Sequence, residues 1–164
     1  MSADTGIRDA VTGLYVREYF DDVIARELER SRRHGIALSV VSVVIVNSAE
    51  VARAGEDATT SVLVEMARVL QQNVRETDHL FRWEEDEFLL LLFEADAAAC
   101  ELKVRQLDQL FRPWRDGAGP VPVPVRVRVG GATHDDDLVF ASVLQAARAT
   151  ARAGASGAGA GTAG

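Results

Sequence analysis

The sequence predicts one α/β (α+β) domain in which helices flank a mixed central β-sheet. Two patterns indicate this fold class. Apolar residues recur at helical spacing in four long segments, and runs of β-branched, leucine and aromatic residues separate those segments, as strands do. The chain has 164 residues, of which 48% are hydrophobic, so it is long enough to bury a single core.

The first half of the chain is predicted to form helices around one buried strand. A turn at residues 9–14 precedes a helix that the apolar spacing places at residues 16–33. Residues 37–46 are an unbroken β-branched run with two serines, which suits a central strand covered on both faces. We expect a short helix or loop at residues 47–55 and a longer amphipathic helix at residues 56–75.

The second half is predicted to contain a β-hairpin, a helix, a strand and a last helix. These elements are expected near residues 78–83, 86–93, 95–111, 121–129 and 138–152, in that order. In the strand expected at residues 121–129, valines alternate with prolines and arginines, a pattern typical of a half-exposed strand near a sheet edge. Gly130 and Gly131 are expected to end it.

Composition sets the domain limits and narrows the partners. We expect a lead-in at residues 1–8, a domain at residues 9–153, and a disordered tail of Gly, Ala, Ser and Thr at residues 154–164. The net charge of −7 argues against binding to nucleic acid or an anionic membrane. The single Cys100 cannot form an internal disulfide, and no apolar run is long enough to span a bilayer, so we expect a cytoplasmic location.

An acidic turn between the two hairpin strands is the most unusual stretch. Four consecutive carboxylates, Glu84 to Glu87, lie at its tip, where like charges repel and neither Gly nor Asn eases the backbone. A purely structural turn would not need them. The sequence therefore directs attention to the hairpin and to the helix end before it.

In order and spacing, several segments resemble a GGDEF domain. They are Asp9-Ala10-Val11-Thr12-Gly13-Leu14 with Arg17 and Phe20, the run Arg75-Glu76-Thr77-Asp78, Arg82, the signature Glu84-Glu85-Asp86-Glu87-Phe88, and residues 125–132. This family comprises bacterial diguanylate cyclases, which condense two GTP molecules into cyclic di-GMP. The resemblance covers residues 9–154 and implies a nucleotidyl-cyclase-like sheet.

The metal positions that the resemblance implies are altered. In the family the first strand ends in two aspartates that help to hold Mg²⁺, but Val44 and Val46 stand there. Hard cations need oxygen ligands, which valine cannot supply, so Asp86 alone remains as a matching ligand. We therefore expect no metal site and no requirement for Mg²⁺.

The nucleotide positions that the resemblance implies also differ. The family has two glycines at the hairpin tip, whereas Glu84 and Glu85 would block and repel GTP. A late helix lysine that meets phosphate in the family falls on Ala151. These differences lead to the expectation of a degenerate domain that has no catalytic residues and is not an enzyme.

The Arg75-x-x-Asp78 run resembles the inhibitory site of the family, where cyclic di-GMP binds. The guanidinium of Arg75 can grip a guanine edge or a phosphate, and Asp78 can accept hydrogen bonds from guanine. A basic residue from the following helix usually completes this site, and here it is either Lys103 or Arg105. The first hypothesis is therefore a cyclic di-GMP receptor that passes a signal to a protein partner.

The second hypothesis is an interaction module that binds no nucleotide. In this case the altered hairpin face docks a protein partner or a second copy of the chain. That face comprises Trp83, Glu84, Glu85, Asp86, Glu87 and Phe88. Trp83 could be an exposed anchor, although packing against the sheet is the better interpretation. The cluster His134-Asp135-Asp136-Asp137 is interpreted as a helix start rather than a metal site, because adjacent residues cannot all converge on one ion.

Overall fold

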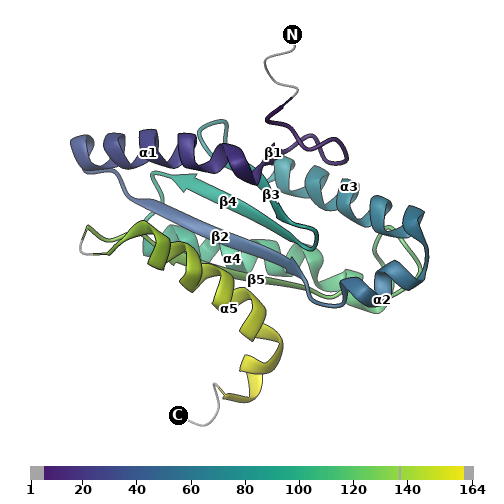
Figure 1. Ribbon diagram of the computed structural model, residues 1–164. Coiled ribbons are helices and arrows are strands. Elements are labelled where there is room, and N and C mark those ends of the chain that lie inside the picture. The colour runs from purple at the N-terminus through teal and green to yellow at the C-terminus, as the bar shows by residue number, and fades with distance from the viewer. Residues whose placement is uncertain (1–5, 137, 161–164) are drawn as a thin grey trace.

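A computed structural model describes residues 6–136 and 138–160 of the chain (Figure 1). Five strands form one sheet in the order β1-β3-β4-β2-β5. The strands are β1 (Tyr15–Val16), β2 (Leu38–Ile45), β3 (His79–Glu84), β4 (Glu87–Phe93) and β5 (Val127–Thr133). β1 pairs in parallel with β3 and the other neighbours are antiparallel, so the predicted mixed sheet is confirmed.

Helices cover both faces of the sheet. They are α1 (Phe20–His34), α2 (Ser48–Arg53), α3 (Glu56–Gln72), α4 (Ala97–Phe111) and α5 (Phe140–Ala160), with short 3₁₀ segments η2 (Arg17–Tyr19) and η3 (Arg112–Asp116). Side chains of α3 and α4 share one buried cluster with the sheet, and side chains of α1 and α5 share the other. The two helix pairs therefore form the outer layers of a three-layer domain (Figure 1).

The centre of the sheet follows the sequence prediction closely. Every residue of β2 and of β4 is buried, as expected for unbroken apolar strands that helices cover on both faces. The hairpin joins β3 to β4 through a two-residue turn, Glu85-Asp86. This arrangement brings Glu84 and Glu87 opposite each other at the base of the turn.

The first helix begins later than the sequence pattern predicts. Residues 15–16 form β1 and residues 17–19 form η2, so the α-helix starts at Phe20 rather than near Val16. Two residues are enough to pair with β3, because Tyr15 lies beside Phe81 and Val16 beside Arg82 in the register. Strand pairing therefore takes precedence over the helical periodicity here.

The position of β5 corrects the sequence prediction. The strand begins at Val127, after the prolines, and it continues through Gly130 and Gly131 to Thr133. A Cβ atom on Gly130 would lie 2.3 Å from the Ala151 nitrogen of α5, and one on Gly131 would lie 2.7 Å from the Cys100 sulfur of α4. The glycines are therefore places where helices approach the strand closely, not strand breakers.

The last helix also extends beyond its predicted end. α5 runs to Ala160, whereas the apolar stripe predicts an end near Arg152, followed by a disordered tail. Alanine favours helix strongly, which the apolar pattern alone does not capture. Residues 1–5 of the expected lead-in and residues 161–164 of the expected tail lie outside the described residues. Within the described part of the chain, no helix is both long and apolar enough to cross a membrane.

Candidate functional site

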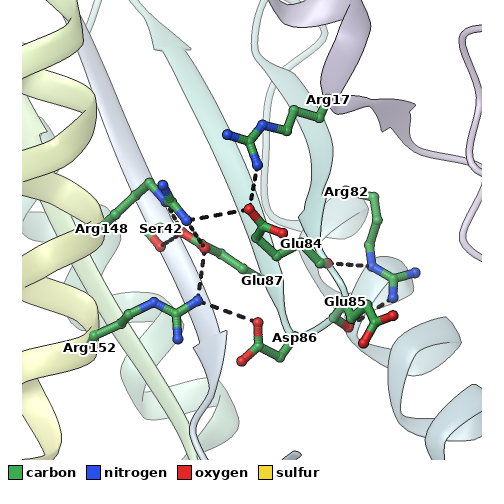
Figure 2. A network of polar contacts seen from close by, with 9 residues as sticks. All are labelled: Arg17, Ser42, Arg82, Glu84, Glu85, Asp86, Glu87, Arg148 and Arg152. Carbon is green, nitrogen blue, oxygen red and sulfur yellow. Dashed lines mark hydrogen bonds and ion pairs between the residues drawn. The ribbon is translucent and has the colours of Figure 1, made fainter.

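The acidic turn is held by a network of arginines that come from other elements (Figure 2). Glu87, at the start of β4, is completely buried. Its carboxylate accepts hydrogen bonds from Arg148 Nε and Nη2, both at 2.9 Å, and from the Ser42 hydroxyl at 2.8 Å. Arg152 Nη2 donates a further bond at 3.0 Å. The turn is therefore not a run of unpaired carboxylates.

This network sets the charge state of Glu87. Burial on its own raises the pKa of a carboxyl group, but the hydrogen bonds from Arg148 and Ser42 and the positive charge of Arg148 act in the opposite direction and outweigh it. The pKa of Glu87 therefore lies below its ordinary value, and the carboxylate is ionised at neutral pH. The same contacts raise the pKa of Arg148.

Two arginines of α5 that the sequence interpretation did not include lie at the hairpin. The expected phosphate-facing position, Ala151, is fully buried and packs against Gly130. Arg148 and Arg152, one helical turn apart, face the hairpin instead, and Arg152 Nη2 also lies 3.4 Å from an Asp86 oxygen. Ala151 therefore does not face the hairpin, whereas Arg148, three residues before it, and Arg152, one residue after it, do.

Glu84, on the other side of the turn, is paired with two arginines. It forms an ion pair with Arg17, and Arg148 Nη2 lies 3.8 Å from it. The Arg17 guanidinium also stacks over Trp83, 4.5 Å from the ring centroid. Contacts with η2 and α5 therefore hold the hairpin base from both sides (Figure 2).

The opening turn of the domain is tied to the same hairpin. Arg82 donates to the carbonyl oxygens of Glu84 and Glu85 at 2.9 and 2.8 Å, and it pairs with Asp9 at 3.4 Å. Asp9 in turn accepts bonds from the backbone nitrogen and the hydroxyl of Thr12. Burial works against these contacts, but the pKa of Asp9 still lies below its ordinary value. Arg82 therefore has a structural role in fixing the turn.

The proposed docking face on the hairpin is mostly inside the protein. Phe88 and Glu87 are fully buried, and Trp83 is 7% exposed and packs edge-on against Phe20. Glu84 and Asp86 are partly exposed and paired with arginines, which leaves Glu85 as the exposed residue of the six. The packing interpretation of Trp83 is confirmed, and Glu85 is the residue of this face that is open to a partner.

A cavity of about 770 Å³ lies beside the turn. Its walls come from α2, the start of α3, the hairpin tip and α5. The lining residues are Ser48, Ala49, Ala52, Thr59, Glu84, Glu85, Asp86, Arg148 and Arg152. Carboxylates of the hairpin tip and guanidinium groups of α5 thus line the same cavity, where an anionic group would meet the arginines and a cation would meet Asp86 or Glu85.

The second candidate site is the turn between α3 and β3. The Asp78 side chain is 2% exposed and accepts hydrogen bonds from the backbone nitrogens of Arg75 and Phe93, at 2.9 and 3.1 Å. Arg75 Nη2 lies 3.3 Å from Asp78 and donates to the Phe93 carbonyl oxygen. Because Asp78 is buried and its oxygens are used, it positions the arginine rather than presenting a free acceptor. The Arg75 side chain itself is 55% exposed.

Lys103 of α4 lies beside this turn, and Arg105 does not. Burial lowers the pKa of Lys103, the charge of Asp78 opposes that change, and the positive charge of Arg75 adds to it. Its Nζ donates to the Asn73 carbonyl oxygen and, at 2.8 Å, to Gln106 Oε1. Arg105 is exposed on another face of α4, with no described contact to the turn. Of the two basic residues that the sequence left open, Lys103 is therefore the one that lies beside the Arg75 turn.

That His134 and the aspartates after it hold no metal stays a prediction. No group of three or more His, Cys, Asp or Glu residues able to hold a metal occurs among residues 6–136 and 138–160. Asp137 lies outside the described residues. His134 Nε2 lies 3.2 Å from the Leu138 carbonyl oxygen, a contact that helps to turn the chain toward α5.

Comparison with known proteins gives a consistent family assignment. The family model described as diguanylate cyclase, GGDEF domain, matches residues 7–158. Diguanylate cyclase DosC of Escherichia coli K12 is 30% identical over 88 residues, which are 53% of this chain and 19% of DosC. The chain thus spans about a fifth of the length of that curated relative.

Solved structures show the same fold. Diguanylate cyclase SiaD of Pseudomonas aeruginosa, in complex with its activator SiaC, has a TM-score of 0.80 at 29% identity, covering 95% of this chain and 60% of SiaD. The GGDEF domain of DgcB from Caulobacter crescentus, in complex with cyclic di-GMP, has a TM-score of 0.80 at 18% identity, covering 93% of this chain and 89% of DgcB.

The comparisons correct one functional expectation. The valines at positions 44 and 46 and the glutamates at positions 84 and 85 led us to expect a protein that is not an enzyme. That expectation is overturned, because the matching family and the relatives of known activity are diguanylate cyclases. The expectation also relied on the lack of a cation at position 151, but Arg148 and Arg152 of the same helix lie at the hairpin.

Proposed function

We propose that this chain, which belongs to the GGDEF domain family of diguanylate cyclases, binds cyclic di-GMP through Arg75 at the turn between α3 and β3. The observation that carries the proposal is the exposed Arg75 guanidinium, fixed by Asp78 and the Phe93 carbonyl oxygen beside the Lys103 ammonium. DgcB, a protein of the same fold, is known in complex with this dinucleotide.

The electrostatics of the turn suit a dianionic ligand. Arg75 and Lys103 bring two positive charges together, and the carboxylate of Asp78 beside them is buried under its own hydrogen bonds. The chain as a whole carries a net charge of −7, so an anion needs a local positive site of this kind. A guanidinium can bond a phosphate or the acceptor edge of guanine with two parallel donors.

Calorimetric titration with cyclic di-GMP tests the proposal. The unmodified chain should bind, and Arg75→Ala should weaken binding by about 2 kcal/mol or more, roughly thirtyfold, because a charge-assisted contact is lost. Arg105→Ala is the matched control, since it removes an exposed arginine of α4 away from the turn. Absence of heat from the unmodified chain at micromolar ligand would sink the proposal.

A second candidate function is turnover of guanine nucleotide in the cavity beside the hairpin. The observation that favours it is that Arg148, Arg152 and Asp86 line the same cavity, where the two arginines could meet the phosphates of GTP. An assay for cyclic di-GMP from GTP and Mg²⁺ tests this candidate. Asp86→Asn should abolish product formation, and an unmodified chain that yields no product would rule the candidate out.

A further inference from the structure

The free edge of β5 is an unpaired surface. β5 is the last strand of the sheet and is seven residues long, with β2 as its neighbour on one side. The opposite edge of the sheet is different, because β1 has two residues and is flanked by a bridge between Arg8 and Tyr15. Long unpaired edges readily accept another strand, and proteins usually shorten or cover them.

The hydrogen-bonding pattern identifies which groups face outward. Val46 N donates to the Arg126 carbonyl oxygen, and His134 N donates to that of Leu38, one at each end of the β2–β5 ladder. In an antiparallel pair, alternate residues bond to the partner strand, so the even-numbered residues of β5 bond to β2. The backbone groups of Val127, Val129, Gly131 and Thr133 therefore point away from the sheet, and no hydrogen bond from them to any other described residue is present.

A cavity borders the second half of this edge. A cavity of about 420 Å³ lies between α4, β5 and α5, next to residues 130–133 of the strand. Small side chains line most of it, including Ala97 and Cys100 of α4 and Thr150 of α5, and Glu101 is the one charged residue among its lining residues. The edge is thus open, and apart from Glu101 uncharged, where the outward groups of Gly131 and Thr133 lie.

We propose that the edge of β5 pairs in antiparallel fashion with β5 of a second copy of this chain. The charges at the two ends of the strand support this occupant. Arg126 and Arg128 lie at the start of β5, and Asp135 and Asp136 follow its end. Antiparallel pairing of two identical strands places the basic end of each copy beside the acidic end of the other.

A pairing centred on Gly130 satisfies the outward hydrogen bonds of both copies and keeps like charges apart. It sets Val129 opposite Gly131 of the second copy, and both residues carry outward backbone groups, so they exchange two hydrogen bonds. It also sets Arg128 opposite Ala132, so that no like charges face each other across the two strands. The interface is isologous, and the association closes at two copies.

Sedimentation analysis over a concentration series tests the proposal with two matched variants. Val129→Pro removes an outward N–H and leaves the bonds between β2 and β5 in place, so it should shift the dimer to monomer. Val139→Pro is the control: it makes the same change at a 72% exposed position just before α5, where proline is tolerated, and dimerisation should persist. An unmodified chain that stays monomeric, or a Val129→Pro variant that dimerises equally well, overturns the proposal.

Amide hydrogen exchange of the unmodified chain tests the pairing of the two β5 edges even if Val129→Pro does not fold. In the unmodified chain, the amides of Val129, Gly131 and Thr133 should become more protected as protein concentration rises, whereas those of Arg128 and Gly130 should be protected throughout. Outward amides that are exposed at every concentration would contradict the pairing. Equal protection at every concentration would also contradict it, because the edge would then be covered within a single copy.

Discussion

The carboxylate of Glu87 on β4 receives the guanidinium of Arg148 from α5 through two hydrogen bonds, one to each oxygen, at 2.9 Å. This contact joins residues 61 positions apart and links the hairpin turn to the last helix. It explains how four consecutive carboxylates can lie in a tight turn: arginines from η2 and α5 neutralise Glu84, Asp86 and Glu87. The turn and α5 are therefore one electrostatic unit (Figure 2).

Removal of the Glu87 carboxylate should destabilise the fold. Glu87→Ala leaves Arg148 and Arg152 without their shared partner and opens a gap in a buried site, at a cost of about 3 kcal/mol. Chemical denaturation with two independent probes measures the change. Glu84→Gln is the control, because the Glu84 side chain is 42% exposed and its loss should cost less than about 1 kcal/mol. Equal costs for the two variants would contradict the role given to the buried pair.

The stability of the chain should fall in acid because of Glu87. Its pKa in the folded protein lies below the ordinary value of 4.5, so the unfolded chain takes up a proton first as the pH falls. The stabilisation is therefore fully present above about pH 5 and is lost progressively as the pH falls through the folded pKa. Denaturation midpoints between pH 6 and pH 3 should decline steeply for the unmodified chain and less steeply for Glu87→Gln. Parallel curves would show that other groups control the acid response.

The close contact of β5 with α5 should make Gly130 intolerant of any side chain. A Cβ atom there would lie 2.3 Å from the Ala151 nitrogen and 2.7 Å from the Ala147 oxygen, both backbone atoms that cannot move aside alone. We expect Gly130→Ala to destabilise the domain by about 2–3 kcal/mol, a typical cost of overpacking. Thermal unfolding measures it against Gly6→Ala, which meets no atom within 4 Å and should be nearly neutral. A neutral Gly130→Ala variant would mean that α5 can shift.

The second cation of the proposed cyclic di-GMP site should be Lys103. Lys103→Met keeps the length of the side chain and removes its charge, so we expect binding to weaken by about 1–2 kcal/mol. Arg105→Met, a comparable change on an exposed face of α4, should leave the affinity unchanged. Titration calorimetry compares the two, with thermal melting as a check, because Lys103 also bonds to Asn73 and Gln106. A larger effect at Arg105 than at Lys103 would reverse the assignment.

Binding at the Arg75 turn should not need a divalent metal. The groups available to a ligand are the guanidinium of Arg75 and the ammonium of Lys103. The nearby carboxylate of Asp78 is buried, and its oxygens already accept hydrogen bonds. Titrations with cyclic di-GMP in Mg²⁺ and in a chelator should therefore give the same affinity at equal ionic strength. Loss of binding on chelation would indicate that a metal ion bridges the ligand to the protein.

Local sequence patterns determined most of the elements and the family. The unbroken apolar runs of β2 and β4 and the amphipathic spacing of α3 depend on neighbouring residues alone, and they predict these elements to within a few residues. The spacing between Arg75 and Asp78 can likewise be read from neighbouring residues. The first helix and β5 were placed less well, because pairing with β3 and close packing against α4 and α5 override local propensity.

The tertiary structure alone decided which charges meet. In the sequence, residues Glu84 to Glu87 are read as an unpaired acidic run. Their arginine partners lie at positions 17, 148 and 152, far away along the chain, so local spacing does not reveal them. The same holds for Lys103, which α4 brings to the Arg75 turn while Arg105, two residues later, points elsewhere. Sequence patterns report spacing along one element. Whether a charge is free, paired or available to a ligand depends on which elements pack together.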